Sequence, residues 1–431
     1  MQVPFLPKSL LVRNTCWMML GQGLKLVIQA LYFTVIARSL GVQNYGAFVG
    51  VIGLVGILSP FGSLGSGYVL IKNVARERRS FNESFGVSLL TTFCSSSLLF
   101  VLVVLVSHFL LPNSIPTRLV IFVAAADLFG ANVTAICGQA FLAFECLQWT
   151  ASINVLLSSL RLLAAIILVA RNLHPSALQW GGFYFGSTSV TAIAAVAAVL
   201  VKLGIPKFSI SRTVAEIREG VYFSVCKSAE TIYNDIDKAM LVRLGTLEAT
   251  GIYGAAYRLI DVSFAPIWSL LAATYPRLFR VGVEGISAAV RYAKPLIFRA
   301  LGYATSVSVL MLAGAGLVPY VLGGEYRLTV EALRWLAVLP ILKVVHFFLS
   351  DVLAGAGHIR MRTFIQIGVA VFNVLINLWL IPAYSWRGAA WSSIASDGLL
   401  ACGVGAAVLY LSRRPQSQGA DVSTLEVSAE T

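Results

Sequence analysis

Long apolar stretches recur along the whole of this 431-residue chain, and they limit its fold more than any other feature. A helix needs about 20 mostly apolar residues to cross the hydrocarbon core of a bilayer. Stretches that meet this need lie at 14–37, 46–70, 85–111, 119–143, 150–170, 180–201, 221–242, 252–274, 295–318, 331–354, 363–381 and 388–411. Charged residues make up only 12% of the chain, against about 25% in soluble domains. These features predict an all-α polytopic membrane protein with about twelve transmembrane helices.

Basic residues are distributed unevenly between the loops, which predicts the orientation. If the amino terminus is cytoplasmic, the basic residues of the inner tails and loops are Lys8, Arg13, Lys72, Arg76, Arg78, Arg79, Lys202, Lys207, Arg212, Arg218, Arg277, Arg280, Arg291, Lys294, Arg360, Arg362, Arg413 and Arg414. The outer loops hold only Arg38, Arg118, Arg171, Arg243, Arg327 and Arg387. Basic loops resist translocation. We therefore expect both termini in the cytoplasm, with 415–431 as a disordered tail, and attribute the net charge of +13 to topology rather than to nucleic-acid binding.

Motifs for catalysis, metal binding or nucleotide binding do not stand out. The six cysteines lie in or beside apolar stretches without CxxC spacing, and the four histidines are scattered without an HExxH motif. No ATPase signature accompanies the glycines of GSLGSG at 62–67. We expect no enzyme activity, no metal and no cofactor.

A polar motif occurs twice, each time directly after an apolar stretch. It reads ARSLGVQNYGAF at Ala37–Phe48 and LVRLGTLEATGIYGAAY at Leu241–Tyr257. The copies lie about 205 residues, or six spans, apart, so both face the same side of the membrane. This spacing predicts two pseudo-symmetric six-helix bundles, 1–207 and 208–414, around a central cavity, as in transporters built from parallel repeats.

The segment GQGLKLVIQALYFTVIARSLGVQNYGAF resembles the amino-terminal signature of the polysaccharide-transporter flippases of the multidrug/oligosaccharidyl-lipid/polysaccharide exporter superfamily. The resemblance continues through Ile252–Leu278 and Gly357–Asp397. It implies 12–14 transmembrane helices and export of polyprenyl-diphosphate-linked oligosaccharide, a lipopolysaccharide or exopolysaccharide precursor, from the inner to the outer leaflet of a bacterial plasma membrane by alternating access. The implied partners are this lipid-linked substrate, membrane lipids, and the glycosyltransferases and polymerase that make and extend the glycan.

Basic residues within the predicted spans are the next informative feature: Lys25, Arg161, Lys227, Lys238, Arg258, Arg299, Arg334 and Lys343. A charge at mid-bilayer costs at least about 2.5 kcal/mol, so each should line a wet cavity, pair with an acid or reach the interface. For Arg299, Arg334 and Lys343 we expect the interface, because long basic side chains extend to the headgroups. Arg258 lies one helical turn from Asp261 and either pairs with it or lines the cavity.

Two polar stripes predict where a diphosphate binds. One face of the seventh span carries Lys227, Glu230, Thr231, Asn234, Asp237 and Lys238, with Asp235 at its edge, and the first span carries Thr15, Gln22, Lys25 and Gln29. We predict that the substrate-binding residues are Lys25, Lys227, Arg258, Gln22, Gln29 and Asn234. In the alternative interpretation, Lys25 pairs with Glu230 and only joins the two halves of the chain.

The acidic residues of the seventh span predict an ion-coupling site made by Asp235, Asp237 and Glu230. A carboxylate buried beside Lys227 or Lys238 could exchange a proton during the transport cycle. The alternative is static pairing with these lysines.

Two other functions compete with the flippase. A cation-coupled multidrug antiporter of the related extrusion group would have a cavity rich in carboxylates and aromatic rings, and Asp235 and Asp237 keep this alternative open. An enzyme acting on the same lipid would need acidic catalytic residues on a sizeable outer loop, whereas the outer loops here are short. The excess of basic residues within the spans favours the flippase.

The charge distribution makes a topology prediction. Reporter fusions at positions 113, 174 and 325 should give external signals, and fusions at 76, 212 and 285 should give internal signals. The exchanged pattern would show that the orientation is reversed.

Overall fold

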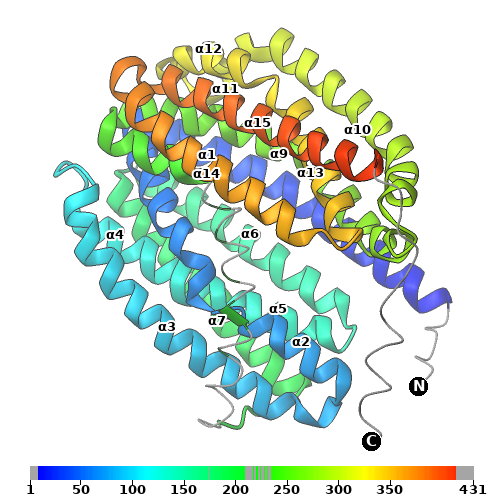
Figure 1. Ribbon diagram of the computed structural model, residues 1–431. Coiled ribbons are helices and arrows are strands. Elements are labelled where there is room, and N and C mark those ends of the chain that lie inside the picture. Colours follow the sequence, from blue (N-terminus) through cyan, green and yellow to red (C-terminus); the bar gives the residue numbers. More distant parts are fainter. Residues whose placement is uncertain are drawn as a thin grey trace, which may run out of the picture. The chain divides into compact units, whose positions relative to one another are not determined.

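The computed structural model describes residues 8–172, 174–208, 217, 220, 221, 224, 228, 231 and 234–413, and these residues are almost entirely helical (Figure 1). The elements are α1 (Lys8–Gly62), α2 (Ser66–Arg76), η1 (Arg78–Ser80), α3 (Phe81–Leu110), α4 (Thr117–Ala124), η2 (Ala125–Ala131), α5 (Asn132–Ala143), α6 (Leu147–Arg171), α7 (Ala177–Lys202), α9 (Leu247–Gly282), α10 (Ile286–Gly314), η3 (Ala315–Leu317), α11 (Val318–Leu322), η4 (Gly324–Tyr326), α12 (Arg327–Leu336), α13 (Leu339–Gly355), α14 (Ile359–Tyr384) and α15 (Trp386–Arg413). Residues 234–244, just before α9, are also helical. The predicted tail 415–431 lies outside the described residues.

Within the described residues, eight helices are long and apolar enough to cross a membrane, or nine if the bent pair Gly324–Leu336 and Leu339–Gly355 forms one span. The first of them, Gly21–Val74, contains two of the predicted spans. These two spans are separated by a break in α1 at Gly41. The predicted span 221–242 falls partly on residues that are not described, and α9 covers the predicted span 252–274. The prediction of an all-α polytopic membrane protein is confirmed.

The break inside α1 lies in the first copy of the repeated motif. Gly41 adopts φ 70° and ψ 169°, a conformation that glycine reaches readily because it has no Cβ. A helix that restarts leaves amide N–H groups without intrahelical acceptors. Here the N–H of Val42 donates to Oε2 of Glu325 over 3.1 Å, and the hydroxyl of Tyr326 donates to the carbonyl of Ala37 over 2.9 Å. A distant segment of the chain, η4, therefore holds the broken helix in place.

The two copies of the motif pack directly against each other through glycine. A Cβ added to Gly46 would lie 1.8 Å from the carbonyl oxygen of Leu247 and 2.8 Å from the amide nitrogen of Gly251. A Cβ added to Gly251 would lie 2.0 Å from the carbonyl oxygen of Val42. Small residues at such positions allow the backbones of membrane helices to approach closely. Gly46 and Gly251 thus bring α1 and α9 into backbone contact.

The chain forms two compact units. Unit 1 contains the residues up to Val262 together with Met311–Ala337 and Ala370–Ser393, and unit 2 contains Ser263–Leu310, Val338–Val369 and the residues from Ile394 onward. One core of unit 1 is built by α2, α3, α5, α6 and α7 around Leu70, Phe85 and Phe141. The core of unit 2 is built by α9, α10, α13 and α15 around Leu278, Ala289 and Val352. The predicted bundle boundary at residue 207 stays a prediction.

The contact between the two motifs makes a stability prediction. Gly46→Ala should lower the unfolding midpoint of the purified protein in detergent, because the added methyl group meets backbone atoms that cannot rotate away; overpacking costs typically about 1–3 kcal/mol. Gly56→Ala is the matched control, since a Cβ there would meet nothing within 4 Å. Equal midpoints for the two variants, measured by thermal denaturation, would contradict the close packing of Gly46.

Candidate functional site

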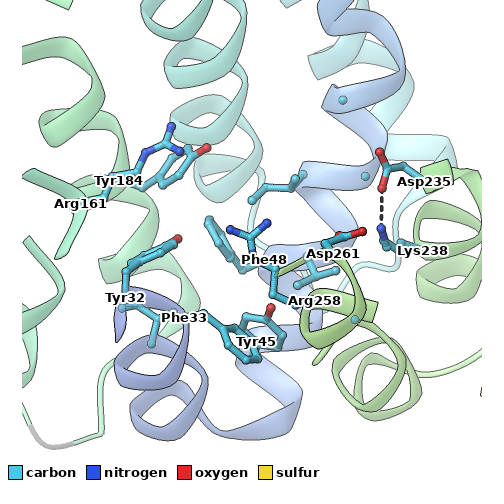
Figure 2. A pocket seen from close by; sticks show the side chains of 16 residues that line it. Tyr32, Phe33, Tyr45, Phe48, Arg161, Tyr184, Asp235, Lys238, Arg258 and Asp261 are labelled. Carbon is cyan, nitrogen blue, oxygen red and sulfur yellow. Dashed lines mark hydrogen bonds and ion pairs between the residues drawn. The ribbon is translucent and has the colours of Figure 1, made fainter. Parts of the chain in front are cut away.

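A cavity of about 340 Å³ lies within unit 1, and the two parts of α1, together with α6, α7, residues 234–244 and α9, form its wall. Its lining residues are Tyr32, Phe33, Ile36, Tyr45, Phe48, Val49, Ile52, Gly53, Gly56, Arg161, Tyr184, Asp235, Lys238, Gly254, Arg258 and Asp261. Figure 2 shows Arg258 between two groups of polar side chains, with Arg161 and Tyr184 on one side and Asp235 and Lys238 on the other. We call this space the unit 1 cavity.

Aromatic rings form one wall of the unit 1 cavity. Phe48 packs edge-on against Tyr184, with ring centroids 5.3 Å apart, and against Trp180 at 5.9 Å. Tyr32 packs against the same Trp180 at 5.5 Å, and Trp180 itself is fully buried. Such aromatic clusters are rigid because each ring fixes its neighbours. The wall therefore has a stable shape on which polar groups can be positioned.

Arg161 of α6 enters the cavity above Tyr184 of α7. Its guanidinium carbon lies 4.2 Å from the centroid of the Tyr184 ring, and its Nη2 donates to Oγ1 of Thr188 over 3.2 Å. The Tyr184 hydroxyl donates to Oδ1 of Asp127 over 2.7 Å, while Arg161 approaches this carboxylate only to 3.9 Å. Nε of Arg161 is buried and has no hydrogen-bond partner among the described residues. Arg161 thus keeps donor capacity for a further acceptor.

Lys238 and Asp235 form an ion pair on the opposite side of the cavity. The ammonium Nζ lies 2.5 Å from Oδ1 of Asp235, one helical turn away, and 4.1 Å from the centroid of the Tyr257 ring. The stripe on the predicted seventh span therefore carries an internal pair that also lines the cavity. Both sequence interpretations, pairing and cavity lining, apply to these two residues.

Arg258 and Lys25 differ from the other cations in their surroundings. Within the part of the chain that the structure describes, neither side chain makes a hydrogen bond or an ion pair. Arg258 lines the cavity one turn from Asp261, which also lines it. Lys25 lies outside the lining but within electrostatic range of Arg258 and Arg161. The positive charges of Arg258 and Arg161 act unfavourably on that of Lys25, and an anion that enters relieves this repulsion.

Asp237 lies behind the cavity wall in a buried polar network. Its carboxylate accepts hydrogen bonds from the hydroxyls of Tyr253 and Ser393, the second over 2.9 Å, and from the N–H of Lys238 over 2.8 Å. Side chains of α14 and α15 form a neighbouring chain of contacts, in which Ser392 donates to Asn377 over 2.5 Å and Asn377 donates to Asn373 over 3.0 Å. Asp237 therefore has neutral donors around it rather than a cation in direct contact.

The structure brings only part of the predicted binding set to the cavity. Of that set, Arg258 lines it, whereas Gln22, Lys25, Gln29 and Asn234 do not. Of the predicted coupling residues, Asp235 lines the cavity and Asp237 lies behind its wall. Lys227 and Glu230 lie outside the described residues, so the proposed pairing of Lys25 with Glu230 stays a prediction.

Sequence reasoning did not assign a role to Asp127, Tyr184 or the aromatic wall. A usable signal existed for Asp127, the only charged residue within the predicted span 119–143. An isolated carboxylate at such a position indicates a buried partner. Tyr184 and Phe48 carry no such signal, because aromatic residues occur throughout apolar spans and only packing separates a cavity wall from a lipid-facing side.

The remaining basic residues within the predicted spans differ in burial, and the placement of Arg299 and Arg334 at the membrane interface stays a prediction. Arg299 and Arg334 are exposed. Lys343 is only 4% exposed, so the expectation that it extends to the interface is wrong. Its ammonium lies 3.8 Å from Oδ2 of Asp397 in unit 2, and this carboxylate holds the side chain inside the protein.

One protein-family model matches most of the chain. The family model described as "Polysaccharide biosynthesis protein" matches residues 11–281, which is more than half of the chain. No curated protein sequence matches the chain.

Solved structures of similar fold are transporters. A multidrug resistance MATE family transporter of the MOP superfamily in its inward-facing conformation has a TM-score of 0.74 at 17% identity, over 90% of this chain and 95% of the other. The lipid II flippase MurJ in an inward closed conformation has a TM-score of 0.75 at 10% identity, over 92% and 87%. A MOP superfamily transporter from Pyrococcus furiosus, described as having a binding pocket of reverse polarity, has a TM-score of 0.57 at 17% identity, over 93% and 96%. At these identities the likeness establishes the fold.

The family match and the fold agree with each other and with the predicted two-bundle membrane architecture. This chain therefore belongs to the polysaccharide biosynthesis protein family and has the helical two-lobe fold of the MOP superfamily transporters.

Proposed function

We propose that this protein is a flippase for polyprenyl-diphosphate-linked oligosaccharide. The observation that carries the proposal is the pair of arginines in the unit 1 cavity, since Arg258 has no partner among the described residues and Nε of Arg161 has no acceptor there. Unused guanidinium donors in an enclosed space are costly unless an anion satisfies them. The family's name and the flippase among the structural neighbours support the same substrate class.

The chemistry of the cavity suits a diphosphate. Guanidinium groups offer planar pairs of N–H donors that match phosphate oxygens, and such charge-assisted hydrogen bonds are about twice as strong as neutral ones. Lys238 is already paired with Asp235, whereas Arg258 lines the cavity without a hydrogen bond or ion pair among the described residues. Lys25 adds positive charge close to both arginines. Tyr32, Tyr45 and Phe48 supply an aromatic surface beside the headgroup.

The charge distribution and the family's name support the substrate and the orientation that we propose. The flippase would take its substrate at the inner leaflet of a bacterial plasma membrane, with both termini in the cytoplasm, and release it at the outer leaflet by alternating access. Glycosyltransferases on the cytoplasmic side would supply the lipid-linked oligosaccharide, and a polymerase on the outer side would consume it. Because the cavity holds only about 340 Å³, it accommodates the diphosphate and the adjoining sugar rather than a long glycan.

A second candidate function is a cation-coupled multidrug antiporter. Asp235 and Asp261 line the cavity, and a multidrug transporter is among the structures of the same fold. However, the ammonium of Lys238 lies 2.5 Å from Asp235, which leaves this carboxylate little capacity for a cationic drug. The two arginines would repel such a drug. An antiporter would raise the resistance of its host to cationic dyes, and this assay separates the two functions.

The arginines of the cavity make the first functional prediction. Arg258→Gln and Arg161→Gln should each slow the flipping of a fluorescent polyprenyl diphosphate in proteoliposomes by about tenfold or more, because a hydrogen bond to a charged group is worth about 1.5–3 kcal/mol. Arg258→Lys should retain part of the activity, since it keeps the charge and loses the fork of donors.

Arg299→Gln is the matched control, because it removes the same charge from an exposed position on α10. It should flip the probe at the wild-type rate. Normal flipping by the double variant Arg258→Gln/Arg161→Gln, at normal protein level, would exclude the cavity as the diphosphate site.

The second functional prediction concerns the coupling of transport to a proton gradient through Asp237 of the predicted seventh span. We propose that Asp237 exchanges a proton as the polar network around it rearranges. Asp237→Asn keeps the shape of the side chain and removes the exchangeable charge, so flipping should continue without acceleration by an imposed proton gradient. If the variant responds to the gradient as the wild type does, the carboxylate only anchors Tyr253 and Ser393.

A further inference from the structure

A second buried cluster of ionisable side chains lies in unit 2, and no residue of it lines the unit 1 cavity. Lys343 and His346 lie on one face of α13, and Asp397 reaches them from α15. Nε2 of His346 lies 3.3 Å from Oδ1 of Asp397, and Nζ of Lys343 lies 3.8 Å from Oδ2. The three residues are 1–4% exposed. We call them the Lys–His–Asp cluster.

The geometry does not suit a purely static ion pair. Burying two charges is compensated only when the pair is close and the remaining lone pairs are satisfied. The contact of Lys343 with Asp397 is long, and Oδ2 of Asp397 is buried without a hydrogen bond from any described residue. The nearby Ser350 hydroxyl is likewise buried without a hydrogen-bond partner in the described part of the chain. Within the described part of the chain, Oδ2 of Asp397 and the Ser350 hydroxyl thus keep unused hydrogen-bonding capacity.

The cluster can change its charge by one proton. With Asp397 ionised and Lys343 charged, the cluster is neutral while His346 is neutral, and it gains one positive charge when His346 takes up a proton. Neutral histidine has one N–H donor and the imidazolium has two, so protonation also adds a donor toward Asp397. Histidine is the side chain whose charge ordinarily changes between pH 5 and 8.

The charged groups that act on His346 come from three helices. They are Lys343 on α13 itself, Arg362 on α14 and Asp397 on α15. Arg362 is engaged with Asp351 through a contact of 3.2 Å, so Asp397 is the acid in direct contact with the imidazole. The positive charge of Lys343, 3.8 Å from the same carboxylate, disfavours a metal ion. The ligand that this chemistry accepts is a proton.

We propose that the Lys–His–Asp cluster of unit 2 is a proton-binding site, with His346 as the proton carrier, and that its protonation drives the transport cycle. Ionisable residues buried inside membrane-spanning segments commonly serve as proton relays. The site is separate from Asp237, which lies in unit 1 among neutral donors. The coupling role rests on the proposed flippase function, whereas the proton site itself does not.

Histidine NMR tests the proton site without any substrate. The chain has only four histidines, so the side-chain signals of ¹⁵N-histidine-labelled protein in nanodiscs can be assigned by comparison with His346→Gln. We expect the His346 signal to titrate reversibly between pH 5 and 9. A His346 signal that keeps one protonation state over this range would overturn the proposal.

Transport in proteoliposomes tests the coupling role. With a fluorescent polyprenyl diphosphate as probe, an imposed proton gradient should accelerate flipping by the wild type and by His108→Gln, whereas His346→Gln should flip at one rate with and without the gradient. The double variant Lys343→Met/Asp397→Asn removes both charges together, so it does not leave one unpaired charge that could cause misfolding. It should also lose the acceleration, because the protonated His346 no longer has Asp397 as its counter-ion. Full acceleration of His346→Gln would overturn the coupling role.

The NMR titration and the transport assay distinguish failure of the proton-site proposal from failure of the proposed flippase function. A wild type that flips no probe would overturn the flippase function, and the NMR titration would still decide whether His346 binds a proton. A titrating His346 together with unchanged acceleration in His346→Gln would leave the flippase intact and reject the coupling.

Discussion

The cost of placing charge inside a membrane-spanning segment organises unit 1. Each cation at the cavity meets this cost in a different way. Lys238 is paired with Asp235 at 2.5 Å, and Arg161 lies over the ring of Tyr184 with Asp127 nearby. Arg258 has no such partner among the described residues. The cations that retain unused donors therefore lie where a substrate anion would enter.

The shape of this cavity depends on glycine. Because Gly46 and Gly251 allow α1 and α9 to touch through their backbones, the aromatic residues of α1 and the arginine of α9 face a common space. The break at Gly41, held by Glu325, sets the direction in which α1 continues into this contact. The repeated polar motif is thus a packing device as well as a sign of internal duplication.

The two ionisable clusters differ in chemistry. The unit 1 cavity is lined by two arginines, and Arg258 has no hydrogen bond or ion pair among the described residues, which suits the diphosphate proposed as its ligand. The Lys–His–Asp cluster of unit 2 is buried, and the ligand proposed for it is a proton. In the proposed cycle, the first site holds the substrate and the second takes up the proton.

The sequence by itself determined the fold class, the chain order of the spans and the presence of costly charges within them. These properties depend on hydrophobicity and charge counted along the chain, and the apolar stretches and the in-span basic residues display them directly. The pairing of Lys238 with Asp235 could also be predicted from the sequence, because residues one helical turn apart lie on one face of a helix.

Only the tertiary structure decided which of these charges share a site. Arg161 lies 77 positions before Lys238 in the chain, yet both line one cavity, and Lys343 meets Asp397 across 54 positions. The expectation that Lys343 extends to the interface failed for this reason, since a buried carboxylate on another helix competes with the headgroups for its ammonium. Contacts between helices depend on packing, on glycines such as Gly46 and on aromatic neighbours such as Tyr184, none of which a single helical face reveals.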